Sequence, residues 1–202
     1  MMAREFEFRT VALVQEISGA TLGRTPSWLQ RPGKSECRNA WTLVKTIYKD
    51  LSGLELPNEM PPRERRTIDA VLVDSKGRER LFEVDETQHF NEFRARTLAY
   101  YPEDLPLGFD RQSWMKAAGL KKRLEGGGFG KPRPPLFPGE NGRHRQRAFR
   151  DALADILPLQ HGMLPTLRIA HWELPPPITK KKVAELLAAK LGPKQTQADQ
   201  QK

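Results

Sequence analysis

The chain has 202 residues, of which 38% are hydrophobic and 29% charged, so its length suits one domain with a modest core. No apolar run approaches the ~20 residues that a membrane-spanning helix needs, and residues 1–17 lack a signal-peptide pattern. The single cysteine, Cys37, excludes an intrachain disulfide and a multi-cysteine zinc site. We therefore expect a soluble intracellular protein of the cytoplasm.

Positive charge is concentrated in the second half of the chain. The formal net charge is +9, but residues 1–110 have a net charge of −2 and residues 111–202 a net charge of +11. A one-sided basic surface favours a polyanionic partner such as nucleic acid, because phosphate neutralisation releases counterions. A solvated basic surface that aids solubility is the alternative interpretation.

The first half of the chain predicts a helix followed by a pair of strands. Residues 1–34 are expected to form a strand or short buried helix over 5–14 and then a Gly- and Pro-rich loop. Ser35 is expected to cap a helix over about 36–50, whose apolar residues recur three and four positions apart. Two β-rich runs follow, over residues 67–73 and 80–85.

The second half is predicted to be mainly helical. The expected elements are helices over about 91–100, 110–124 and 143–157, a strand over 167–174, and a helix that Thr179 caps and Gly192 ends. The Gly/Pro-rich residues 126–142 are predicted to be a flexible loop, either a substrate-contacting loop or a plain linker.

These elements predict an α/β fold with a small central mixed β-sheet flanked by helices. The predicted division of the chain is an N-terminal strand and loop over 1–34, a core over 35–175, a basic C-terminal helix over 176–192 and a disordered tail over 193–202.

Acidic residues interrupt both β-rich runs. The turn Ser75-Lys76-Gly77 predicts a three-residue hairpin loop with Gly77 in the left-handed conformation. In that register Asp69 lies opposite Glu83, and Asp85 lies on the same face two residues further. A two-residue turn would instead place Asp69 and Glu83 on opposite faces.

Three carboxylates on one face of a hairpin repel each other unless a cation or basic side chains neutralise them. Hard oxygen ligands suit Mg²⁺, with Mn²⁺ as an alternative. Surface salt bridges to neighbouring arginines are the competing interpretation, with partners Arg65, Arg66, Arg78 and Arg80.

The order Ile68-Asp69, then Glu83-Val84-Asp85 and Gln88-His89-Phe90, resembles the PD-(D/E)xK nuclease superfamily. It is most similar to the branch whose second motif reads E-[VI]-D-G-x-x-H, as in very-short-patch-repair-like endonucleases. The resemblance covers roughly residues 35–173 and implies a restriction-endonuclease-like core that hydrolyses DNA phosphodiester bonds with Mg²⁺.

The resemblance assigns metal binding to Asp69 and Glu83, with Asp85 at the position where the general pattern has a lysine. Glu86 replaces the usual glycine of this branch. Gln88 and His89 match the polar pair that ends the second motif, and Glu36 matches the acid on the family's leading helix. For His89 a structural hydrogen bond, and for Glu36 a place on the helix surface, are the alternatives. Without the lysine, metal-bound water is the candidate general base.

Basic side chains in the second half are the expected phosphate contacts. They are Lys121, Lys122, Arg123, Arg143, Arg145, Arg147, Arg150, Lys180, Lys181 and Lys182. A solvated helix face is the alternative for each group.

The leading hypothesis is a metal-dependent DNA endonuclease in DNA repair, restriction or a mobile element, nucleoid-associated when bound to DNA. The second is a non-catalytic nucleic-acid-binding module on the same fold, similar to RAP domains, which bind RNA. The third is a basic accessory protein without catalysis. DNA is the preferred partner and RNA the less favoured one.

Overall fold

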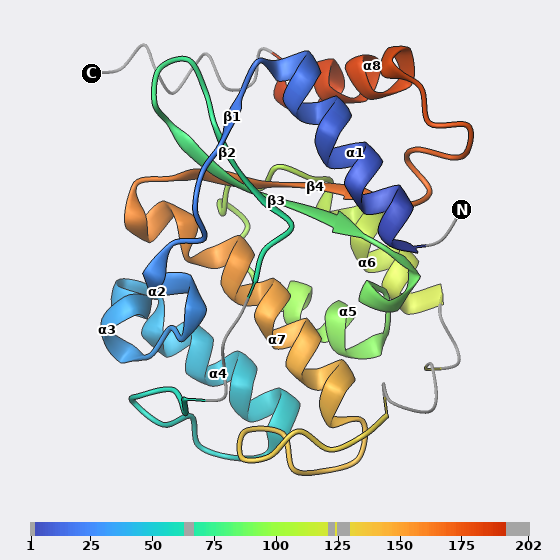
Figure 1. The fold of residues 1–202 in the computed structure, drawn as a ribbon. Coiled ribbons are helices and arrows are strands. Elements are labelled where there is room, and N and C mark those ends of the chain that lie inside the picture. Colours follow the sequence, from blue (N-terminus) through green and yellow to red (C-terminus); the bar gives the residue numbers. More distant parts are fainter. Residues whose placement is uncertain (1–2, 63–66, 121–123, 125–129, 193–202) are drawn as a thin grey trace.

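The structure is a computed structural model that describes residues 3–62, 67–120, 124 and 130–192. It is an α/β fold with one mixed sheet between helices, as the sequence predicts (Figure 1). The elements are α1 Ala3–Ser18, β1 Thr21–Leu22, α2 Ser27–Gln30, α3 Lys34–Cys37, η1 Arg38–Ala40, α4 Trp41–Ser52, β2 Ala70–Val73, β3 Glu79–Asp85, η2 Thr87–His89, α5 Glu92–Ala99, α6 Arg111–Leu120, α7 Gly142–Ile156, η4 Pro158–His161, β4 Leu164–Ala170 and α8 Lys180–Leu191. Within the described ranges, no helix has the length and apolar character that would span a membrane.

The four strands are arranged in the order β1-β2-β3-β4. The pairs β1/β2 and β2/β3 are antiparallel, whereas β3 and β4 are parallel. A parallel pair needs a long crossover, and the chain makes it through α5, α6 and α7. The crossover therefore brings the basic helix α7 against the sheet.

The sheet separates two layers of helices. Helices α1 and α8 cover one face, and α4, α5 and α7 lie on the other (Figure 1). Leu72, Phe82 and Val84 pack in the core on the α1/α8 side, while Leu81 packs with Ala154 of α7. Because side chains alternate along a strand, Glu83 and Asp85 share the face of Leu81 and point to the α7 side.

The N-terminal segment is a helix, which confirms the helical alternative for residues 5–14. The N-terminal strand in the predicted division of the chain is wrong. Phe6, Thr10 and Val14 are buried and lie four residues apart, which is the spacing of one helix face. Phe8, which gave the segment its alternating look, has 68% of its surface exposed. The strand of this region is the short β1, which pairs with β2.

Two further local predictions are corrected. Gly33, rather than Ser35, precedes the first turn of α3, and the main helix of this region, α4, begins at Trp41. The part of the Gly/Pro-rich segment that the structure describes, residues 130–142, packs into the core through Leu136 and Phe137, which are 4% and 1% exposed. Predictions for residues 121–123, 125–129 and 193–202 lie outside the described residues.

Candidate functional site

The β2–β3 hairpin has the register that the sequence predicts. Ala70 pairs with Phe82 and Val73 with Glu79, and Gly77 has a φ of 75° in the left-handed region. The Gly77 N–H donates to the carbonyl of Asp74 at 2.9 Å. One step beyond the Ala70–Phe82 pair, Asp69 precedes β2 on the side of Glu83.

A pocket of about 230 Å³ lies between this hairpin and helix α7. Thr67, Asp69, Glu83 and His89 line the side formed by the hairpin and η2. Side chains of α7 line the other side, and they are Arg143, Gln146, Arg147, Arg150 and Asp151. The structure thus brings two of the three predicted hairpin acids, the predicted histidine and three predicted arginines into one pocket.

Asp69 lies directly before β2, and a hydrogen bond from the backbone holds its side chain. Its Oδ2 accepts from the Val84 N–H at 2.8 Å. Burial raises the pKa of Asp69 to about 7, and the negative charges of Glu7 and Asp85 add to this effect. A bound cation would reverse the balance, because it stabilises the charged carboxylate.

Glu7 of α1 is an acid of this region that the sequence reasoning missed. Its charge acts on Asp69, although α1 belongs to the opposite helix layer. Glu36, the acid matched from the resemblance, does not line the pocket. Its carboxylate instead accepts from the Gly33 N–H at 2.8 Å and from the Ser35 hydroxyl at 2.7 Å.

Asp85 lies beneath the pocket and does not line it. The side chain is fully buried, and each carboxylate oxygen accepts one strong hydrogen bond. Arg168 Nη1 donates to Oδ1 at 2.6 Å, and Trp114 Nε1 donates to Oδ2 at 2.7 Å. Of the three carboxylates expected to converge, two therefore face the pocket and the third is neutralised by an arginine.

His89 connects the pocket to this buried layer. Its Nδ1 lies 3.0 Å from Asp151 Oδ2 and 3.4 Å from Asp85 Oδ1. Burial lowers the pKa of His89, but the two carboxylates outweigh it and raise that pKa above its ordinary value. The two carboxylates therefore stabilise the charged imidazole, in which both ring nitrogens donate hydrogen bonds.

The rest of the second motif has local partners. Gln88 Nε2 donates to Glu86 Oε2 at 2.5 Å, and Gln88 does not line the pocket. Glu86 stands where the branch has glycine, and its φ of −81° is an extended conformation that any residue adopts. The substitution therefore leaves the local turn intact.

A buried ion network supports the site from below. Asp155 accepts from Arg94 Nη2, Arg168 Nε and the Tyr101 hydroxyl, each at 2.7 Å. Asp85, Asp151 and Asp155 lie against the basic side chains of Arg94, Arg168 and His89. Such a network tolerates burial because each charge has a partner and a hydrogen bond.

The network was missed by the sequence reasoning, although a signal exists. Asp151 and Asp155 lie four residues apart among the apolar residues of the buried face of α7. Arg168 likewise interrupts an apolar strand, where its side chain is completely buried. Buried charges of this kind need partners.

The predicted phosphate contacts separate into groups. Arg143, Arg147 and Arg150 line the pocket, whereas Arg145 points to the other side of α7. There its Nη1 donates to the carbonyl of Leu51 at 2.7 Å, and its guanidinium lies 5.0 Å from the ring centre of Phe93.

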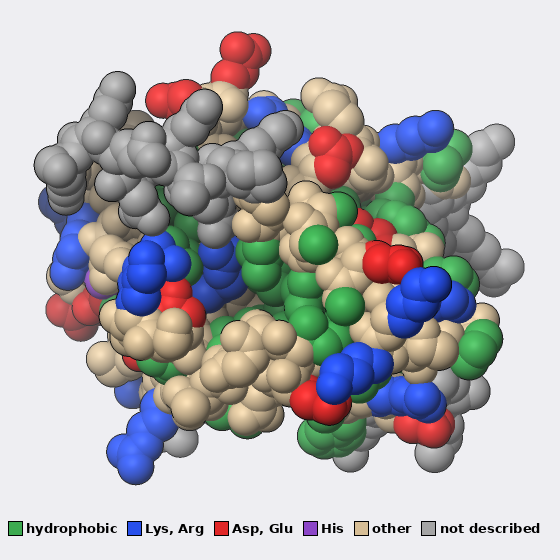
Figure 2. Space-filling model, turned by 90° about the horizontal axis from the view of Figure 1, so that it is seen from above, with side chains coloured by type: hydrophobic (Ala, Val, Ile, Leu, Met, Phe, Trp, Pro, Cys, Tyr) green, Lys and Arg blue, Asp and Glu red, His purple; other side chains and the backbone are tan. Residues whose placement is uncertain are grey.

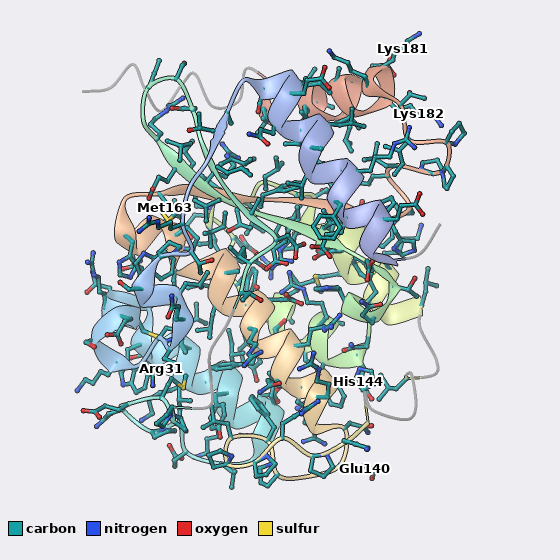
Figure 3. All side chains as sticks on the ribbon, viewed as in Figure 1. Arg31, Glu140, His144, Met163, Lys181 and Lys182 are labelled. Atoms are coloured by element: carbon teal, nitrogen blue, oxygen red, sulfur yellow. The ribbon has the colours of Figure 1, made fainter. Side chains whose placement is uncertain are left out.

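The lysines of α8 lie across the sheet from the pocket. Lys180 is 2.7 Å from Glu16 and Lys181 is 3.9 Å from Glu185, while Lys182 donates to the carbonyls of Pro175 and Pro177 at 3.1 Å. Figure 2 shows this side, where the visible basic side chains are scattered among acidic and apolar ones. In Figure 3 Lys181 and Lys182 lie at the opposite end of the molecule from His144 of α7. Lys121, Lys122 and Arg123 lie outside the described residues.

Asp69 and Glu83 line one pocket, and carboxylate oxygens are the ligand type that a hard divalent cation prefers. Among the residues that the structure describes, no three His, Cys, Asp or Glu side chains are grouped as a metal site. Mg²⁺ does not require such a group, because it keeps several waters and takes one or two carboxylates together with substrate phosphates. Asp69 and Glu83 supply that donor set beside three arginines.

Comparison of the chain with protein-family models, with curated proteins and with solved structures gives no match.

Proposed function

We propose that the protein is a metal-dependent endonuclease that hydrolyses phosphodiester bonds of DNA. The observation that carries the proposal is the two-sided pocket, with Asp69 and Glu83 on the hairpin side and three arginines on the α7 side. Carboxylates bind a hard cation, and guanidinium groups bind phosphate oxygens in pairs. The combination suits a phosphate held between a cation and arginines, and the proposed core is restriction-endonuclease-like.

Each pocket residue has a distinct task in this proposal. Asp69 and Glu83 hold Mg²⁺ or Mn²⁺, which when bound supplies Lewis-acid activation of water and phosphate. Arg147 and Arg150 bind the phosphate and stabilise the negative charge that grows on it. His89, oriented through Nδ1 by Asp151, offers its second ring nitrogen as a donor to the substrate.

Plasmid nicking tests the proposal. The wild-type protein is expected to relax supercoiled plasmid with Mg²⁺ or Mn²⁺ and to be inactive with EDTA. Asp69→Asn and Glu83→Gln are each expected to lower the rate by at least a hundredfold, because each removes a charged ligand. Glu36→Gln is the matched control, since that carboxylate does not line the pocket. Metal-dependent nicking that persists in both pocket variants contradicts the assignment.

One observation favours a second candidate, a non-catalytic nucleic-acid-binding module. No lysine is among the described residues that line the pocket, and Asp85 at the expected lysine position is bound by Arg168. A module of this kind retains phosphate binding through the arginines and lacks hydrolysis. It predicts salt-sensitive binding of RNA or DNA with no cleavage in any divalent metal.

A further inference from the structure

The pocket face of α7 carries arginines along its length. Arg143, Gln146, Arg147, Arg150 and Asp151 follow the i, i+3, i+4, i+7, i+8 spacing of one helix face. With a rise of about 1.5 Å per residue, the backbone positions of Arg143 and Arg150 are about 10 Å apart along the helix. The arginines are therefore distributed along the pocket and not grouped on a single turn.

The two ends of this face of α7 have different surroundings. At its C-terminal end Asp151 holds His89, and the positive charge of Arg147 acts on His89. At the N-terminal end, Figure 3 shows His144, the neighbour of Arg143, on the part of α7 that lies far from the sheet. Arg147 and Arg150 thus belong to the carboxylate end, and Arg143 lies further from it.

A phosphodiester has two non-bridging oxygens, and one guanidinium fork can occupy both. Three forks spread over about two helical turns match more than one phosphate. We propose that α7 binds at least two successive phosphates of one polynucleotide strand, with one near Arg147 and Arg150 and its neighbour near Arg143. This inference rests on the proposed function for the identity of the reacting phosphate, and it names the substrate as an internal stretch of chain. A mononucleotide or a terminal phosphate fills only one of the two positions.

The number of phosphates is measurable from the salt dependence of binding. The logarithm of the binding constant falls with the logarithm of salt concentration, with a slope of about −0.9 per phosphate contact on duplex and about −0.7 on single strands. We suggest fluorescence anisotropy with a labelled DNA oligonucleotide between 50 and 200 mM salt, in EDTA so that no cleavage occurs.

Arg143→Gln and the paired substitution Arg147→Gln/Arg150→Gln are each expected to reduce the magnitude of the slope by roughly 0.7–0.9, because each removes the arginines of one phosphate. The triple variant is expected to reduce it by about twice that amount. Arg145→Gln is the matched control, because it removes the same charge from the other face of the same helix. Arg31→Gln is a second control that leaves α7 untouched, since the exposed Arg31 lies far from His144 in Figure 3. Thermal melting of each variant confirms that it folds.

A triple variant whose slope equals that of the Arg147→Gln/Arg150→Gln variant means that Arg143 contacts no phosphate of its own, and it overturns the inference. Slope changes in Arg145→Gln and Arg31→Gln equal to those in Arg143→Gln mean undirected charge attraction and overturn it as well. The test is separate from that of the proposed function, because it needs no hydrolysis. If the slope changes are additive but the protein never nicks plasmid, the binding of two phosphates by α7 stands and the endonuclease proposal is rejected.

Discussion

Asp69 is in an unfavourable setting for a carboxylate. Burial and the charge of Glu7 raise its pKa to about 7, and one backbone hydrogen bond opposes them. An acid whose pKa is higher in the folded state than in the unfolded state costs stability once both states are ionised. A residue kept at such a cost is typical of a functional site.

Replacing Asp69 with asparagine is therefore expected to stabilise the protein at pH 8. Below about pH 3 the carboxyl is mostly neutral in both states, so its charge no longer affects the stability difference between the two proteins. As the pH rises from about 4 to about 7, the unfolded state ionises first and the wild type loses stability relative to the variant. The expected difference at pH 8 is about 1–3 kcal/mol, measured by urea unfolding at several pH values. A variant less stable than the wild type at pH 8 contradicts this account of the charge.

At the scale of elements, sequence patterns were sufficient to predict structure that depends on residues close together in the chain. Gly77 and the alternation of the flanking residues were enough for the hairpin register, and therefore for the Asp69–Glu83 pair. Helices α5, α7 and α8 follow from apolar periodicity and caps, such as Thr179, which accepts from the Lys182 N–H. For residues 5–14 the sequence left strand and helix open, because Phe6 and Phe8 alternate as they would in a strand.

The hairpin register depends on the left-handed residue of its turn. Gly77→Ala is expected to lower the free energy of unfolding by about 1 kcal/mol, because a Cβ disfavours a φ of 75° although nothing lies within 4 Å of it. Gly119→Ala in α6 is the control: it also meets nothing within 4 Å, and alanine is the better helix former. Opposite signs for the two variants are expected in thermal melting. A destabilisation of equal size in both argues against a conformational cause.

At the scale of the whole molecule, the ion network joins β3, β4, α5 and α7 beneath the pocket. Arg168 contacts Asp85 and Asp155, which are 83 and 13 residues away in sequence. The contact with Asp85 depends on the parallel pairing of β3 with β4. No local pattern contains that pairing. The sequence therefore placed Asp69 and Glu83 correctly but put Asp85 with them, because it contained no sign that Arg168 would neutralise Asp85.

Arg168→Met is expected to destabilise the fold by about 3–5 kcal/mol, since it leaves buried carboxylates without their partner. Arg145→Met removes the same charge from the side of α7 that faces Leu51 and Phe93. It should cost much less, because the part-buried guanidinium contacts one carbonyl and one ring and no carboxylate. Denaturant unfolding of both variants checks the difference. Equal losses show that the network does not carry the expected share of stability.

The most direct test of the central claim is Mn²⁺ binding at pH 8, measured by isothermal titration calorimetry without nucleic acid. The wild-type protein is predicted to bind Mn²⁺ in the pocket, and Asp69→Asn and Glu83→Gln are each predicted to weaken binding at least tenfold, while Glu36→Gln leaves it unchanged. This follows because the two hairpin carboxylates are the proposed protein ligands and Glu36 lies elsewhere. Mn²⁺ affinity that is the same in the wild type and in both pocket variants contradicts the claim.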